Sequence, residues 1–224
     1  MAKKVFGAFY NVDVKKDLDF DNIQAISLNL RKCAKAEFTL VYTNKKDEQG
    51  FFVGGHAEHH NEPQIVEVNS TGGVNLTVEQ KDPRAEGLLR ITLALPVGKK
   101  LVGFRSDGNV IEYNIIGVDI AHVNISNKKG HIKFKGRVDN LGLFSTYYPV
   151  EAEVELYQDS LIQVGSRTAD VTLKLNNAGE VVIERQPNVV CTVDHTTIGK
   201  NNPATYQAKV YFPSQAEGKY TIIK

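Results

Sequence analysis

The chain has 224 residues and is close to neutral, with 27 Lys and Arg against 26 Asp and Glu. This length suffices for one large β domain or two smaller ones, and the balanced charge selects neither nucleic acid nor an anionic membrane as a partner. Roughly 18 consecutive apolar residues would be needed for a spanning helix, and no window reaches that length. We therefore expect no membrane contact.

The start of the sequence and its two cysteines bear on the cellular compartment in which we expect the protein to be made. Asn11 and Asp13 interrupt the apolar stretch that follows the basic start, so we read no signal peptide and expect synthesis in the cytoplasm. The two cysteines, Cys33 and Cys191, lie far apart and form no disulfide framework. Two reduced thiols are expected, with one long-range bridge as the alternative.

Alternating apolar and polar residues predict strands along almost the whole chain. Residues 23–33 fit both a helical stripe and a strand, and we expect one short helix near residues 22–33. Strands are expected at residues 5–12, 38–43, 51–53, 64–69, 74–79, 88–95, 101–104, 110–116, 118–125, 131–138, 150–157, 160–164, 171–175, 181–185, 189–194, 205–212 and 220–223.

The number and spacing of these strands predict the fold class. Many short strands separated by turn residues are typical of antiparallel β-sandwiches and barrels, so the predicted class is all-β. A second series of strands begins near residues 117–127. We therefore expect a β-rich domain at residues 1–116 and a sandwich-like domain at residues 117–224, with a single larger domain as the alternative.

Two segments in the second half carry matched and opposite charges. Residues 131–138 and 150–157 each place apolar side chains on one face of an extended chain. The opposite faces hold the cations His131, Lys133, Lys135 and Arg137, and the anions Glu151, Glu153 and Glu155. If residues 139–149 fold back as a loop, the acids and bases face each other and fix the strand register.

The segment between these ladders is too apolar for a solvated loop. It contains Leu141, Leu143, Phe144, Tyr147 and Tyr148. Such a loop is expected to bury against its own domain or to dock onto a neighbouring subunit, where aromatic anchors are common.

A histidine-rich loop is the candidate metal site. His56, His59 and His60 lie within seven residues together with Glu58 and Glu62. Zinc and copper use these ligand types, but the spacing matches no established metal motif, and a polar loop between strands is the simpler interpretation. Metal binding at the three histidines is kept as a hypothesis.

Other chemical patterns are incomplete. The acidic run from Asp17 begins like a calcium-binding EF-hand loop but has Asn22 and Leu28 where a glycine and a bidentate glutamate are required. Cys191 alternates with core-facing valines, which disfavours a thiol nucleophile. We predict no catalytic residues and no cofactor, and the glutamate ladder argues against nucleic acid on the adjacent cations.

These patterns favour a non-enzymatic structural protein, a β subunit that associates with copies of itself in a virion-like particle, tube or filament of the capsid, decoration or tail-tube type. The predicted interface consists of Lys133, Lys135, Arg137, Leu143, Phe144, Tyr147, Tyr148, Glu151, Glu153 and Glu155. One alternative is a β-sandwich module that binds carbohydrate or a small ligand, with Tyr113, Tyr147 and Tyr148 as stacking groups. A second is a metal-dependent enzyme built on residues 56–62.

Overall fold

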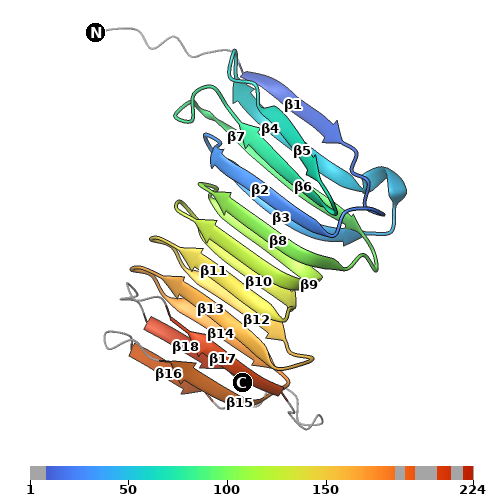
Figure 1. The fold of residues 1–224 in the computed structure, drawn as a ribbon. Helices are drawn as coiled ribbons and strands as arrows, with labels where there is room; N and C mark the ends of the chain where they lie inside the picture. The colour runs from blue at the N-terminus through green and yellow to red at the C-terminus, as the bar shows by residue number, and fades with distance from the viewer. Residues whose placement is uncertain (1–8, 185–189, 195–205, 213–218, 224) are drawn as a thin grey trace, which may run out of the picture.

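The computed structural model describes residues 9–184, 190–194, 206–212 and 219–223. These residues form eighteen strands and one 3₁₀ turn, Lys46–Glu48, and no α-helix. The strands lie across the long axis of an elongated body, one above the next (Figure 1). The prediction of an all-β protein is confirmed.

The strands form two sheets that pack face to face. Sheet A runs in the order β1 (Phe9–Lys16), β4 (Gly50–Glu58), β7 (Gly87–Pro96), β3 (Ala36–Thr43), the first half of β9 (Glu112–Asn127), β10 (His131–Arg137), β12 (Val150–Glu155), β14 (Val171–Asn176), β18 (Lys219–Ile223) and β16 (Val190–Asp194). Sheet B runs in the order β5 (Gln64–Ser70), β6 (Gly73–Glu79), β2 (Ala25–Lys32), β8 (Leu101–Gly108), the second half of β9, β11 (Asn140–Ser145), β13 (Ser160–Ser166), β17 (Tyr206–Tyr211) and β15 (Ala178–Glu184).

Most neighbouring strands are parallel, which corrects the expected antiparallel pairing. Among the described strands only β1–β4, β4–β7 and β5–β6 pair antiparallel. The reason lies in the chain path, because from β6 onward consecutive strands enter opposite sheets. β10 in sheet A is followed by β11 in sheet B, and β12 then returns to sheet A parallel to β10. Each such pair of strands is one coil of a solenoid.

Two local predictions are wrong for related reasons. Residues 25–32, expected as a helix, form strand β2, in which Ile26, Leu28 and Leu30 are buried and alternate with more exposed residues. Pairing with β6 and β8 decides this ambiguous segment. The expected loop at residues 139–149 contains strand β11, whose inward side chains Leu141 and Leu143 explain its apolar composition.

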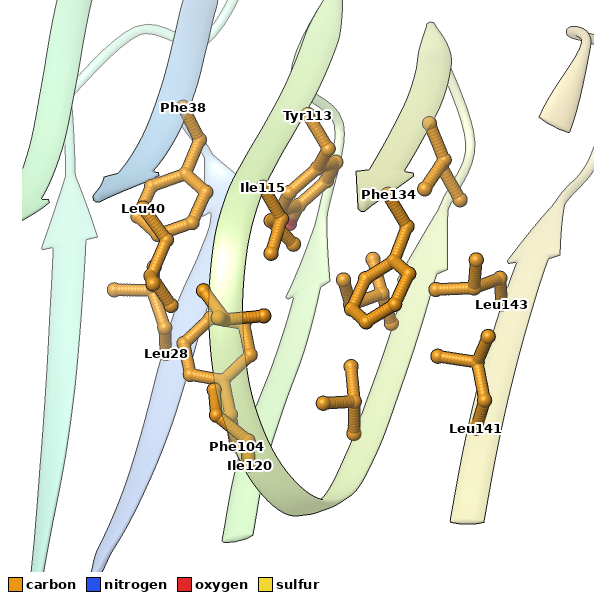
Figure 2. Packing of buried hydrophobic residues seen from close by; sticks show 14 of the residues in the cluster. Leu28, Phe38, Leu40, Phe104, Tyr113, Ile115, Ile120, Phe134, Leu141 and Leu143 are labelled. Atoms are coloured by element: carbon orange, nitrogen blue, oxygen red, sulfur yellow. The ribbon is translucent and has the colours of Figure 1, made fainter. Parts of the chain in front are cut away.

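The core is a continuous layer of aliphatic and aromatic side chains between the sheets (Figure 2). Phe38 of β3 stacks on Phe104 of β8 across the layer, with ring centroids 5.9 Å apart, and also contacts the edge of Tyr113. Tyr113 is fully buried and its hydroxyl pairs with Ser106 Oγ at 2.8 Å. Burial raises the pKa of Tyr113 above its ordinary value.

Strand β9 connects the two halves of the chain. Its first half pairs with β3 and β10 in sheet A, and its second half pairs with β8 and β11 in sheet B. A bulge at Gly117, where φ is +67°, bends the strand between these two parts. The strand thus runs without a break through the expected boundary at residue 117, and the two-domain division stays a prediction.

Neither cysteine forms a disulfide. Cys33 is buried, with Sγ 3.4 Å from the carbonyl oxygen of Val78, and burial raises its pKa to about 12. Cys191 is half-buried on the terminal strand β16 of sheet A.

Candidate binding site

The outer face of sheet B carries a row of polar side chains that crosses six strands. Parallel register places Asn75, Ser27, Arg105, Asn124, Gly142 and Gln163 side by side, one from each of β6, β2, β8, β9, β11 and β13. We call this set the polar row. Neighbouring strands are about 4.8 Å apart, so the row presents a hydrogen-bonding group at nearly every such step across the sheet.

A second row of outward-facing residues lies two residues away along each strand, and the side chains at one end of this row are very short. Gly73, Ala25 and Gly103 occupy adjacent strands there, and His122, Asn140 and Leu161 continue the row. Because glycine and alanine project little or no side chain, the sheet is hollowed into an open trough of about 390 Å³. The trough lies over the centre of sheet B.

A smaller hollow of about 210 Å³ adjoins the trough and shares Asn124, Gly142 and Gln163 with it. It is flanked by Phe144 of β11 and Tyr211 of β17, both half-buried. A hydrogen bond to Glu184 raises the pKa of Tyr211, as does partial burial, so this ring stays neutral. The two hollows together give one surface with amides at its centre and aromatic rings at one end.

Among the described residues, no acidic side chain lines the trough, and Arg105 is the one permanently charged side chain in its lining. Arg105 is exposed and forms no ion pair with any described residue. Asp107 lies two residues along the same strand, but its carboxylate is bound by Arg31. Asn140 Nδ2 of β11 donates to His122 Nδ1 of β9 at 2.9 Å, which orients the imidazole in the trough.

The predicted charge ladders lie on the other face of the molecule, on the outside of sheet A. Parallel pairing of β10 with β12 places Lys133, Lys135 and Arg137 opposite Glu151, Glu153 and Glu155. Lys135 binds Glu153 at 2.9 Å and Arg137 binds Glu155 at 3.4 Å, whereas Lys133 binds Glu112 of β9 at 2.8 Å.

Five of the six ladder residues thus form an ion pair within the chain, two of these pairs joining β10 to β12 and one joining β10 to β9. The hydrogen bond from Lys135 lowers the pKa of Glu153, and the bond to Glu112 raises the pKa of Lys133. An interface role for the six ladder residues stays a prediction.

The structure separates the remaining predicted interface residues. Leu143 is buried between the sheets and is not available to a partner. Phe144 points outward on sheet B, away from the ladders, while Tyr147 and Tyr148 are exposed in the turn after β11. Tyr113, expected as a stacking residue for a ligand, is fully buried in the core.

The candidate metal ligands do not form a compact donor set. His56 lies in β4, and His59 and His60 stack on each other in the turn that follows, with ring centroids 4.6 Å apart. Within the described ranges, no group of three or more His, Cys, Asp or Glu side chains is arranged to hold a metal ion. The metal hypothesis gains no support from this geometry.

The sequence does not predict the trough, because the strand that begins at residue 101 is expected to end at residue 104. Gly103 then lies near the end of that strand, and Arg105 lies beyond it. In the structure β8 continues to Gly108. The usable signal was a glycine inside an alternating segment, which often marks a place where a ligand or another backbone approaches closely.

Comparison with known proteins gives a fold likeness only. No protein-family model matches the sequence, and no curated protein matches it. A solved structure of a candidate cell adhesion protein from Clostridium sporogenes shares the fold, with a TM-score of 0.54 and 11% identity over 96% of this chain and 99% of that chain. A candidate adhesin from Bacteroides fragilis gives a TM-score of 0.35 and 11% identity, covering 96% of each chain.

This comparison contradicts the predicted virion subunit of capsid, decoration or tail-tube type, because the solved structure that shares the fold is a candidate cell adhesion protein. The physical basis of that prediction also changes, since Lys135 and Arg137 form their ion pairs inside the chain. No described residue belongs to a helix long and apolar enough to cross a membrane. The cytoplasmic location and the association with copies of itself stay predictions.

Proposed function

We propose that this chain is a non-enzymatic binding module that holds a carbohydrate chain against the outer face of sheet B. The observation that carries the proposal is the continuous surface formed by the trough and the adjoining hollow, which share Asn124, Gly142 and Gln163. It combines several hydrogen-bonding groups with two aromatic rings, and ligand sites join apolar surface to polar groups that orient the ligand.

The chemistry of this surface suits sugars. Amides such as Asn124 and Gln163 both donate and accept hydrogen bonds, as sugar hydroxyls do. Phe144 and Tyr211 offer flat apolar surfaces to the carbon-bound face of a pyranose ring. The polar row repeats at the strand spacing, so it fits an extended chain that lies across the strands rather than a compact molecule.

The fold likeness agrees with this proposal. A candidate cell adhesion protein has the same architecture. Adhesion to a cell or matrix through carbohydrate requires a long, rigid, open face, and a stack of parallel strands provides one. The paired charges on sheet A make that face a less suitable site, because its carboxylates and cations already bind each other.

Filling the trough tests the proposal. The Cβ of a residue at position 103 would have its nearest contact 3.8 Å away, at Ala25, so the backbone tolerates a side chain there. Gly103→Phe should keep the fold and block the trough, whereas Gly103→Ala should leave most of it open. We expect Gly103→Phe to weaken carbohydrate binding by about tenfold or more, since the ligand loses its contacts with several strands.

Binding is measured on an array of oligosaccharides and then by calorimetry for the oligosaccharides retained. Circular dichroism and the thermal midpoint of each variant confirm that the fold is kept. Undiminished binding by Gly103→Phe would place the ligand elsewhere, and a wild-type protein that retains no oligosaccharide would remove the proposal.

A further inference from the structure

The charges along sheet B indicate which class of carbohydrate this surface selects. The argument depends on the proposed function, because it concerns the ligand of the same trough. Its first element is Arg105, the permanent cation of the trough, which lies in the middle of the polar row. A guanidinium presents two parallel N–H donors that match a carboxylate, and Arg105 has no such partner within the described residues.

The second element is the pairing state of the neighbouring charges. The acidic side chains on the same face are already occupied. Asp107 binds Arg31, and Glu79 binds Lys32 at 2.7 Å. These pairs cancel locally, so Arg105 remains as the uncompensated charge at the centre of the trough, and an anionic ligand would meet no opposing carboxylate there.

A second exposed cation lies further along the same face. Lys209 of β17 is aligned with Leu161 of β13 and has no ion-pair partner among the residues that the structure describes. Two carboxylates lie on the next strand, β15, where Glu180 accepts a hydrogen bond from Gln207 and Glu184 accepts one from Tyr211. Both keep their negative charge because these donors are neutral, so Lys209 is an outer cation of the same track that has carboxylates on the strand beyond it.

The separation of the two cations favours a polymer. β8 and β17 are four strand steps apart in sheet B, which corresponds to about 19 Å at a spacing of ~4.8 Å. Lys209 also lies one row away from Arg105 along the strands, because it aligns with Leu161 whereas Arg105 aligns with Gln163, so a ligand must span several sugar residues to reach both cations. A chain that carries a carboxylate on many of its residues meets both cations at once.

From these observations we infer that the trough binds an acidic polysaccharide, a linear chain of sugars that bear carboxylate groups, with Arg105 as the central carboxylate contact and Lys209 as a second one. The amides of the polar row bind the hydroxyls between the charged positions. Selection for acidic over neutral chains comes from the cations, and the length preference comes from their spacing.

The test compares acidic oligosaccharides with neutral copies of themselves. The probes are oligomers of galacturonate, of the alginate uronates and of hyaluronan, each in its acid form and as its methyl ester. Calorimetry at low and at moderate salt measures the affinity of the wild-type protein and of Arg105→Gln, Arg105→Lys and Lys209→Gln. Arg90→Gln is the matched control, since Arg90 lies on the outside of sheet A and pairs with Glu37.

We expect the wild type to bind at least one acidic series about tenfold more tightly than its methyl ester, with a preference that falls as salt rises. Arg105→Gln should abolish this preference, Arg105→Lys should retain part of it, and Arg90→Gln should leave it unchanged. Lys209→Gln should reduce the gain in affinity that longer oligomers show.

The two proposals fail in different ways. Equal binding of esters and acids, or an acid preference that survives in Arg105→Gln, would overturn the inference while leaving carbohydrate binding in place. A wild-type protein that binds no acidic oligomer, no ester and no other oligosaccharide would overturn the proposed function itself.

Discussion

Gly130 shows how a single residue fixes the path of the chain between β9 and β10. A Cβ at this position would lie 2.0 Å from the carbonyl oxygen of Ile111. That oxygen also accepts the hydrogen bond from the backbone N–H of His131 at 3.2 Å. The carbonyl of Gly130 in turn accepts a hydrogen bond from Asn127 Nδ2 at 3.0 Å, so the residue is held between the backbone of Ile111 and the side chain of Asn127.

Replacing Gly130 with alanine should therefore destabilise the fold. The clash is with backbone and cannot be relieved by rotating a side chain, so we expect a loss of about 3 kcal/mol in the free energy of unfolding. Gly103→Ala is the matched control and should leave stability unchanged or raise it by up to about 1 kcal/mol. Urea unfolding measures both, and an equally stable Gly130→Ala variant would show that this contact is not tight.

Single residues on sheet B also mark the limit of sequence reasoning. The sequence predicted a strand at residues 101–104 and a helix near residues 22–33, and it could not show which polar residues of different strands become neighbours. Ser27, Arg105 and Asn124 are far apart in sequence, and only the parallel register brings them into one row. The candidate site was thus outside what the sequence could predict.

At the scale of the element, the paired strands β10 and β12 carry a testable register. Lys135→Glu removes the ion pair with Glu153 and places a carboxylate opposite it. We expect this change to lower the free energy of unfolding by about 0.5–1 kcal/mol. Adding Glu153→Lys restores the pair, although the new lysine lies beside Lys174 of β14 and recovery should be incomplete. Urea unfolding of the two single variants and the double variant gives the coupling energy.

The pH dependence of this coupling has a definite sign. The pKa of Glu153 is lowered in the folded chain, mainly by the hydrogen bond from Lys135, so the pair contributes stability above the ordinary range of glutamate. The contribution is lost as pH falls through the folded-state pKa. A coupling energy of zero at neutral pH, or one that grows on acidification, would contradict the pairing.

The ladders illustrate what elements reveal from sequence alone. Opposite charges at matched spacing predicted that residues 131–138 lie beside residues 150–157, and the structure places β10 beside β12. The direction was not encoded in that pattern, because cations face anions equally well in parallel and antiparallel pairs. The intervening segment held the missing information, since Leu141 and Leu143 alternate as in a strand of the opposite sheet.

At the scale of the whole molecule, stability should fall from the middle of the stack toward its ends. β9 has a bonded neighbour on each side in both sheets, whereas in the described structure β5 pairs only with β6 and β1 only with β4. In such stacks each coil is stabilised mainly by its neighbours. Opening a central strand therefore requires the separation of more neighbouring strands than opening an edge strand does.

Hydrogen exchange followed by mass spectrometry tests this gradient. We expect the amides of β9 to exchange most slowly and those of β5 to exchange at least about tenfold faster, because edge strands open without disturbing the core. Peptides from the buried strand β2 serve as the internal comparison. Uniform protection along the stack would instead indicate one fully cooperative unit.

The order of strands in the stack is the part of the fold that the sequence concealed most completely. β7 lies between β3 and β4, and β17 lies between β13 and β15, so sequence order and spatial order differ near both ends. Such a placement is set by which strand pairs with which free sheet edge, and the composition of a single strand does not specify that edge.

The stacking direction also determines how the molecule responds to tension. β1 lies at one end of sheet A, and β18 is the second strand from the other end, so a pull that separates them acts along the line of the interstrand hydrogen bonds. Bonds loaded in this way open one strand at a time, like a zipper, and never share the load. A module of this kind yields gradually when stretched from its ends, whereas force applied along the strands, across the trough, is divided over a whole row of bonds at once.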